Sequence, residues 1–439
     1  MKFRPLLSLL FGCLTLGACG LHAQQFYWDS ASTRSAGMGG AYVASSSNVL
    51  DALATNPAGL TYLRGGNLNL EVDGIFARGS FQDPSNANAT LSNTPGVVPM
   101  GAFGMPIKHS RFSFGIGMTP DLLSKGDWHY IDTPGVAGAT YGMQQQYSEI
   151  YALRYSAGVG FVVNSKLSLG ATIGADYNSN YLIAPYIFQS QPALAGLKTL
   201  LNLHTTGYGF NGSFGVLAHP TRKLELGAAW KSHTIINSTG YASGDVSAQF
   251  AALGVNAPST FTYDAMVHNN IPQSVNGTLA WQARPSWLFA FQGDWINWHN
   301  SFVNLPVALT NGTNGTINSI VGGPSMNDGV PLDWKDQYVL HFGVEHPVTE
   351  SISLRAGYSH GNSPVPDSTL TPLTAAIFTN QFSTGLTYTH GRVHYEAAYS
   401  FGPEASQSVG QSGLLSGEYN NSTVKVGTQA LKVGLSYQF

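Results

Sequence analysis

The chain has 439 residues, of which 10% are charged and 43% are hydrophobic, and its formal net charge is −3 at pH 7. Soluble proteins carry roughly 25% charged residues, so this composition disfavours a soluble protein, and the weakly acidic balance argues against nucleic acid as a partner. No segment has the ~20 consecutive apolar residues that a transmembrane helix needs. A membrane β-barrel, whose strands alternate between lipid and lumen, fits this combination.

The first 23 residues have the pattern of a secretory signal peptide. Residues 1–4 are basic, and the apolar run 6–16 is too short to span a bilayer before small residues follow. We expect cleavage after Ala23, so that the signal peptide covers 1–23. Two alternatives stay open, namely cleavage after Gly20 and lipidation of Cys19, which ends a stretch that resembles a lipobox.

A segment rich in Ser, Ala and Gly, residues 24–64, separates the leader from the first strand pattern. It is too long and too apolar for a solvated tail. It contains Asn56, Pro57 and Ala58, in which Asn-Pro predicts a turn. We therefore expect this segment to pack as a separate element against the remainder of the chain.

Residues 65–439 show a period of two, which is typical of β-strands with unlike faces. The predicted strands are 66–80, 97–108, 111–120, 147–163, 166–178, 205–219, 222–236, 260–283, 286–299, 336–346, 351–360, 379–389, 392–402 and 428–439. This even number, about fourteen, suits a closed barrel. Short joins alternate with long Gly/Ser/Asn/Pro-rich segments such as 179–204 and 300–335, as in outer-membrane barrels. Pro272 cannot donate to a ladder, so 260–283 is one kinked strand or two.

Charged side chains fall on one face of these strands. In 147–163, Tyr151, Leu153 and Tyr155 share a face, and Arg154 lies on the other. A charge that faces lipid at mid-bilayer costs roughly 2–4 kcal/mol, so the charged face should line the lumen. A soluble β-sandwich would alternate in the same way but would carry many more charges. The fold class we predict is therefore all-β, a transmembrane antiparallel β-barrel.

Two long connections are too apolar for ordinary exposed loops. The first, residues 192–201, carries Leu194, Leu197, Leu200 and Leu201 and is compatible with a helix. The second, residues 246–253, is similar. Both are candidates for a surface that captures hydrophobic molecules, and packing onto the barrel rim is an equally good interpretation.

Three features together resemble outer-membrane transporters of the FadL/TodX type, which carry long-chain fatty acids or aromatic hydrocarbons. The Asn56-Pro57-Ala58 motif follows a small-residue opening at 35–42, and the last strand ends on Phe439. A second block has similar order and spacing, with its parts at 334–338, 353–358 and 363–367. The resemblance covers the mature chain and implies a monomeric barrel of fourteen strands in the bacterial outer membrane. It also implies that 24–64, here called the hatch segment, plugs the lumen of the barrel formed by 65–439.

The resemblance implies passive uptake of hydrophobic compounds, fatty acids or hydrocarbons, by capture at the outer loops and lateral release into the outer-membrane lipid. The alternative is a FadL-like barrel that serves a protein secretion system as a docking component. An open polar porin would not need an apolar plug. We predict the lateral exit at 111–120, where Gly115 and Gly117 weaken pairing and Pro120 lacks a donor.

Arg154 and Arg355 are the candidate ligand-binding residues, because the alternation places both inside the wall at mid-strand. A planar guanidinium would bind a substrate carboxylate in two places. The alternative is that each arginine pairs with a luminal acid or with the hatch segment. Tryptophans near strand ends predict an interfacial aromatic girdle. They are Trp287, Trp295, Trp298 and Trp334.

The sequence gives no support for an enzyme, a metal site or a cofactor. Residues 357–361 match the nucleophile-elbow pattern G-x-S-x-G, but the prolines that follow cannot form the required helix. The thirteen histidines include no His-Glu-x-x-His zinc motif. Both cysteines, Cys13 and Cys19, lie in the leader, so cleavage after Gly20 or Ala23 leaves a chain without thiol chemistry.

Overall fold

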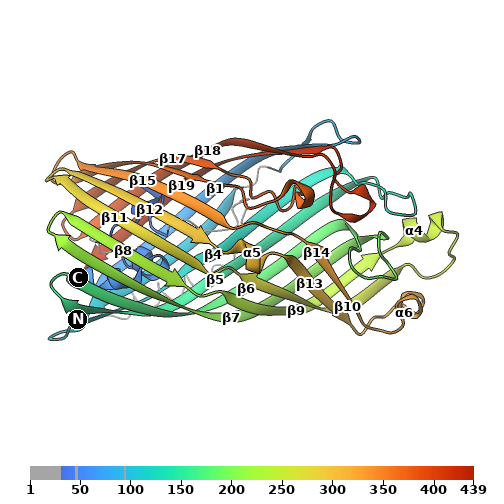
Figure 1. Cartoon of the computed structure of the whole chain (residues 1–439), viewed down its shortest axis with the longest axis horizontal. Helices are drawn as coiled ribbons and strands as arrows, with labels where there is room; N and C mark the ends of the chain where they lie inside the picture. The colour runs from blue at the N-terminus through green and yellow to red at the C-terminus, as the bar shows by residue number, and fades with distance from the viewer. Residues whose placement is uncertain (1–30, 45–47, 93–94) are drawn as a thin grey trace.

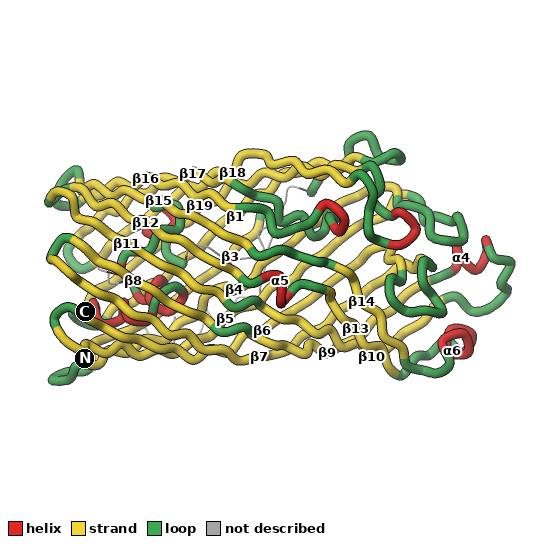
Figure 2. The backbone as a smooth tube through the Cα atoms, in the orientation of Figure 1, coloured by secondary structure: helices red, strands yellow, loops and turns green. Residues whose placement is uncertain are grey.

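The structure, a computed structural model, describes residues 31–44, 48–92 and 95–439. The predicted leader with its cleavage sites, and residues 24–30 of the hatch segment, lie outside these ranges. The chain forms a closed antiparallel barrel of fourteen strands with an N-terminal helical segment. Figure 1 and Figure 2 show tilted strands along the whole length, with the C-terminus at the end that has the short turns.

The barrel wall follows the chain from β1 to β19 and closes where the last strand pairs with the first, from Asn67 opposite Gln438 to Gln82 opposite Thr423. In its fourteen strands, β8 with β9 and β10 with β11 each count as one interrupted strand. The segments are β1 (Asn67–Gln82), β3 (Gly96–Pro106), β4 (Phe112–Ile131), β5 (Met143–Asn164), β6 (Leu167–Ile187), β7 (Lys198–Thr221), β8 (Leu224–Lys231), β9 (Thr234–Asp245), β10 (Thr260–Ile271), β11 (Ser274–Arg284), β12 (Trp287–Ile296), β15 (Gln337–Pro347), β16 (Ile352–Gly361), β17 (Asn380–His390), β18 (Val393–Val409) and β19 (Ser422–Gln438). β2 (Ala89–Thr90) and the hairpin β13 (Asn304–Thr310) with β14 (Met326–Pro331) add to the wall near the long loops.

The alternation of faces confirms the predicted membrane barrel. On β1, Val72 and Phe76 are 41% and 43% exposed on the outside, whereas Asp73 is 4% exposed on the inside. Arg154 and Asp176 are buried completely, at 0%. The outward face is apolar because it meets lipid, and the charged side chains find partners only in the lumen.

Two neighbouring wall strands are each interrupted at mid-height. β8 and β9 together fill the predicted strand 222–236, and β10 and β11 fill 260–283. The breaks lie side by side, because Ile271 pairs with Thr234 and Ser274 pairs with Lys231. Pro272 has no N–H for the ladder, which explains the break in 260–283; the sequence pattern did not predict the matching break in 222–236.

The strands extend further toward the long loops than predicted. β6 and β7 continue their pairing up to Ile187 opposite Lys198, so most of the predicted loop 179–204 is strand. In this region Ala184 and Ile187 lie on opposite faces of β6, and both are buried. Both faces are buried because loops cover the strands here. A strand buried on both faces has no clear period of two, and so its sequence resembles a loop.

The hatch segment folds into short helices inside the barrel: α2 (Thr33–Gly37), α3 (Val49–Ala54) and the 3-10 helix η2 (Pro57–Tyr62). The outer connections carry α4 (Ser247–Ala252), α5 (Trp298–Ser301), α6 (Gly315–Val321), η3 (Asp367–Thr369) and η4 (Leu415–Gly417). None of the helices in the described ranges is long and apolar enough to cross a membrane. Figure 1 shows the blue helices of the hatch segment within the half that has the short turns.

Candidate functional site

The Asn-Pro-Ala motif of the hatch segment binds the inner wall. The Asn56 side chain accepts a hydrogen bond from Ala58 N at 3.1 Å, which caps η2 with Pro57 as its first residue. Asn56 Nδ2 donates to the carbonyls of Val216 at 3.1 Å and Ala228 at 3.2 Å. One buried side chain therefore both starts the helix and ties it to β7 and β8.

Glycines of the wall make room for this motif. A side chain at Gly215 would overlap the Asn56 amide, and one at Gly170 would overlap the backbone of Pro57 and Ala58. Close backbone approach is a function that glycine alone fulfils, since any Cβ would push the hatch segment away. The inner wall is thus shaped to the hatch segment.

Arg154, one of the two predicted ligand-binding arginines, contacts the hatch segment. Its Nη1 donates to Leu53 O at 3.0 Å, its Nε to Asn211 Oδ1 at 2.8 Å, and its Nη2 to Thr172 Oγ1 at 2.7 Å. These contacts favour the alternative that Arg154 holds the end of α3 against the wall. Its binding to a substrate carboxylate stays a hypothesis.

Arg355, the second candidate, belongs to a network around Glu345. Its Nε lies 2.5 Å from Glu345 Oε2, and its Nη1 donates to Thr387 Oγ1 at 2.7 Å. The same carboxylate receives both Nε and Nη2 of Arg34 from α2, at 2.8 and 2.9 Å. Arg355 therefore acts with Glu345 to seat α2, and its role toward a ligand likewise stays a hypothesis.

Other luminal polar groups bind backbone atoms of the hatch segment and were not selected from the sequence. Glu225 accepts from Ala44 N at 2.8 Å, and Gln292 accepts from Tyr42 N at 3.0 Å. His341 Nδ1 lies 2.6 Å from Gly39 O, and its Nε2 lies 3.0 Å from Asp294 Oδ2. The alternation of faces marked Glu225 and His341 as luminal, but it carries no information about which hatch atom each one meets.

A cavity of about 150 Å³, here called the outer cavity, lies in the outer half of the barrel, between the strands β4, β5, β6 and β10 and the long loops. Its lining is largely apolar and aromatic, with Leu122, Ile150, Val267, Phe302, Trp334 and Leu373 among its residues. Polar atoms come from asparagines of β6 and from Glu418 of the last long loop. A largely apolar lining with a few polar groups is the usual make-up of a small-molecule site.

The predicted aromatic girdle is wrong for Trp298 and Trp334. Both are 0% exposed, and their ring centroids lie 5.0 Å apart beside Phe302. Trp287 is 38% exposed on the outside and stacks on His346. The long loops fold back over the lumen, so two tryptophans that stand near strand ends in the sequence form the inner core of the outer half.

The predicted capture loop packs down onto the barrel rim. Leu194 and Leu197 are 5% and 8% exposed and pack in a cluster with Phe188 and Phe250. Leu200 and Leu201 are half-buried in β7. Residues 192–196 form turns and not the helix that the sequence allows. Of the two interpretations, the contacts favour packing onto the rim.

An ion cluster joins the loops above the outer cavity. Lys198 Nζ lies 3.2 Å from Asp132 Oδ2 and 3.5 Å from Glu418 Oε1, and Lys198 is 0% exposed. Asp132 follows the end of β4, Lys198 begins β7 and Glu418 follows η4, so the cluster fastens three separate segments to one another. Burial raises the pKa of the Glu418 carboxyl to about 7, and the charge of Lys198 partly opposes this shift.

The predicted exit strand, 111–120, is regular over most of its length. Gly115 pairs with Gly104 and Gly117 pairs with Ala102. Their missing side chains make room for the hatch segment, because a Cβ there would lie 2.8 Å from Leu60 and 2.9 Å from Leu53. The expectation that these two glycines weaken the pairing is therefore wrong.

The irregularity begins after Met118, where the pairing of β4 with β3 ends. A bulge follows between Pro120 and Leu122 in the pairing with β5. Every residue of 119–126, here called the kinked segment, is buried, so neither of its faces meets lipid. Leu122 lines the outer cavity, and Leu123 packs in a cluster with Leu50 of the hatch segment. The kinked segment thus lies between the cavity and the place where the β3–β4 ladder is open.

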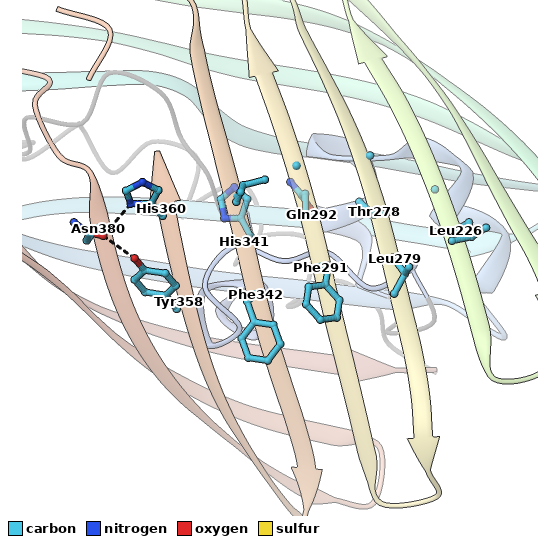
Figure 3. A pocket seen from close by; sticks show the side chains of 14 residues that line it. Leu226, Thr278, Leu279, Phe291, Gln292, His341, Phe342, Tyr358, His360 and Asn380 are labelled. Carbon is cyan, nitrogen blue, oxygen red and sulfur yellow. Dashed lines mark hydrogen bonds between the residues drawn. The ribbon is translucent and has the colours of Figure 1, made fainter. Parts of the chain in front are cut away.

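A groove on the outside of the barrel crosses β8, β11, β12 and β15. Figure 3 shows Leu279, Phe291 and Phe342 on the outer side of these strands. Gly277 and Gly293 leave the strip beside them without side chains, and a Cβ at Gly277 would meet nothing within 4 Å. This face meets lipid in the membrane, so we do not assign the groove a function in transport.

Within the described ranges, no group of three or more His, Cys, Asp or Glu side chains could hold a metal ion. A comparison with curated protein sequences gives no match. Among solved structures, a FadL homologue of Pseudomonas aeruginosa is similar, with 16% identity, a TM-score of 0.75 and coverage of 94% of this chain and 100% of that chain.

Two further structures have the same fold. The toluene transporter TodX of Pseudomonas putida has 21% identity and a TM-score of 0.73, with 95% of this chain and 100% of that chain covered. The toluene transporter TbuX of Ralstonia pickettii has 17% identity and a TM-score of 0.70, with 94% and 99% covered. The family model described as outer membrane protein transport protein (OMPP1/FadL/TodX) matches residues 14–439. The chain is therefore an outer-membrane β-barrel that belongs to the OMPP1/FadL/TodX family of transport proteins.

Proposed function

We propose that this protein lets small hydrophobic compounds, about the size of one aromatic ring, cross the outer membrane passively. The observation that carries the proposal is the outer cavity, with its volume of about 150 Å³. An engineered cavity of about this volume with Leu, Ile and Phe in its lining binds benzene. The solved relatives that are named as toluene transporters point to the same class of substrate.

The chemistry of the lining supports an aromatic solute over a long acyl chain. Trp334 and Phe302 offer ring faces and edges to a planar guest, and Ile150 and Val267 complete an apolar surround. A long-chain fatty acid would need more room than the cavity offers. It would also need a free cation for its carboxylate, whereas the contacts of Arg154 and Arg355 are taken up by protein groups.

We further propose that solutes leave sideways, past Leu122, through the opening between β3 and β4. The kinked segment separates the outer cavity from this opening, so a shift of a few side chains would connect them. Straight passage along the barrel axis meets the hatch segment, which Asn56, Arg34 and Arg154 fasten to the wall. A docking component of a secretion system, the alternative, would have no need of an apolar cavity with aromatic side chains in its lining.

The test is toluene uptake into vesicles that contain the purified protein and trap the solute. Leu373→Trp should fill the outer cavity and lower uptake about tenfold, the effect of ~1.4 kcal/mol of lost binding. Leu415→Trp is the matched control, because Leu415, the first residue of η4, is 37% exposed and lies outside the cavity lining. Equal uptake by both variants would contradict the proposal, and so would preferential uptake of a long-chain fatty acid.

A further inference from the structure

An ion pair bridges the lumen from the kinked segment to a wall strand that is not its neighbour. Asp121 of β4 and Lys231 of β8 meet at 3.0 Å, and the two residues are 6% and 7% exposed. β5, β6 and β7 lie between their strands in the wall. Other luminal pairs differ, since Asp73–Lys432 and Lys125–Glu149 join residues that are direct cross-strand partners.

The pair can form because β4 leaves the wall. If the β3–β4 register continued beyond Gly101 and Met118, Val97 would stand opposite Leu122 on the lipid face. Val97 does lie there, 43% exposed, but Leu122 is 3% exposed and lines the outer cavity. The bulge at Asp121 therefore turns the strand inward. This turn brings the Asp121 carboxylate to Lys231.

The surroundings make one cation necessary in this ion pair. Asp176, also buried, accepts hydrogen bonds from Asn211 and from Thr234 close to Lys231. Without the lysine charge, two buried carboxylates, Asp121 and Asp176, would be left with less cationic compensation. An uncompensated buried charge is strongly unfavourable, so Asp121 would move away and take the kinked segment with it.

We propose that the Asp121–Lys231 ion pair is a positioning device that keeps the kinked segment inside the lumen and the ladder between β3 and β4 open. The proposal rests on the proposed lateral release for its role in transport. Its structural part, that loss of the pair lets β4 return to the wall, can be tested without any transport measurement.

The structural test uses a disulfide between Val97→Cys and Leu122→Cys. The two side chains lie on opposite sides of the wall, so no disulfide should form in the otherwise unchanged protein. In the Lys231→Met background β4 is expected to pair with β3, and the disulfide should form. The charge-exchanged background Asp121→Lys/Lys231→Asp should again prevent it.

Transport is measured in the same backgrounds without the two cysteines. Lys231→Met should lose most of its toluene uptake, and Asp121→Lys/Lys231→Asp should regain it. The control Asp73→Asn/Lys432→Met removes a luminal ion pair between neighbouring strands, and it should keep its uptake. Heat-modifiable migration in gels shows which variants have folded barrels.

Unchanged uptake and no disulfide in folded Lys231→Met would overturn the proposal. If Lys231→Met does not fold, the charge-exchanged variant decides: retained uptake supports the pair, and loss of uptake from a folded barrel contradicts it. If the unchanged protein takes up no toluene, the proposed function fails, while the disulfide result still decides whether the pair positions β4.

Discussion

At the scale of single residues, polar side chains inside the barrel hold the hatch segment through individual hydrogen bonds. Asn56 shows this most directly, since its amide uses the acceptor for Ala58 N and both donor contacts for Val216 and Ala228. The amide is buried, so a lost partner is not replaced freely by water. Such residues control how firmly the hatch segment is seated without contacting a solute.

Replacing Asn56 separates its two roles. Asn56→Ala removes the cap and the two donor bonds, which should cost about 1–3 kcal/mol of hatch seating and raise the ion conductance of the barrel in planar bilayers. Asn56→Asp keeps the cap acceptor but places a carboxylate against two carbonyls, so its conductance should rise as well. A low conductance in Asn56→Asp together with a high one in Asn56→Ala would show that only the cap matters.

At the scale of elements, the long connections form a packed roof and not a set of free loops. β6 and β7 rise beyond the predicted strand ends, and Leu194 and Leu197 fill the space between them and α4. The cluster of Lys198, Asp132 and Glu418 then joins three separate segments. On the proposed function, a solute would pass this folded layer on its way to the outer cavity.

This layer should respond to pH through Glu418. Its pKa in the fold is about 7, raised by burial above the ordinary value of 4.5, so the folded state holds a proton that the unfolded segment has lost. Its contribution to stability is present below about pH 4.5 and is lost as the pH rises through 7. Hydrogen exchange of residues 410–421, corrected for intrinsic rates, should quicken between pH 5 and 8.

Glu418→Gln is the control for this effect, because it keeps the size and removes the titration. Its exchange should show no such dependence on pH over the same range. If hydrogen exchange in Glu418→Gln quickened with pH as much as in the unchanged protein, another group near Lys198 would be responsible for the effect.

At the scale of the whole molecule, barrel and hatch segment differ in what holds them. The wall is a continuous set of antiparallel ladders closed by β1 and β19. The hatch segment contributes short helices that pack on the inner wall through Arg34, Asn56 and the contacts of Arg154. The wall is therefore expected to fold without the segment, and the segment is expected to control what passes.

Deletion of residues 24–60 tests this division. The closed barrel should still form and keep heat-modifiable migration, because no wall ladder is lost. Ion conductance should rise strongly, since charged groups such as Glu345 and Arg355 would line a wet lumen. Unchanged conductance and unchanged uptake together would show that the segment does not block the lumen.

The sequence by itself determined the barrel, the number of its strands and the inward side of charges such as Arg154 and Arg355. These features follow from a local rule. In a strand of a barrel wall, residues i and i+2 lie on the same face, so both meet lipid or both meet the lumen. Tyr155 and Arg154 are assigned to opposite faces by that rule alone. The resemblance of the Asn56-Pro57-Ala58 motif to the family could also be read from the sequence, because the three residues are adjacent in the chain.

The tertiary structure decided which groups meet across the lumen. Asp121 and Lys231, or Arg154 and Leu53 O, are far apart in the chain and become neighbours only when the barrel closes around the hatch segment. The burial of Trp334 and the inward turn of β4 at Leu122 have the same origin. The alternation along a strand assigns each residue to one face of the wall. The distance between side chains across the lumen depends instead on barrel closure, strand tilt and the volume of what lies inside.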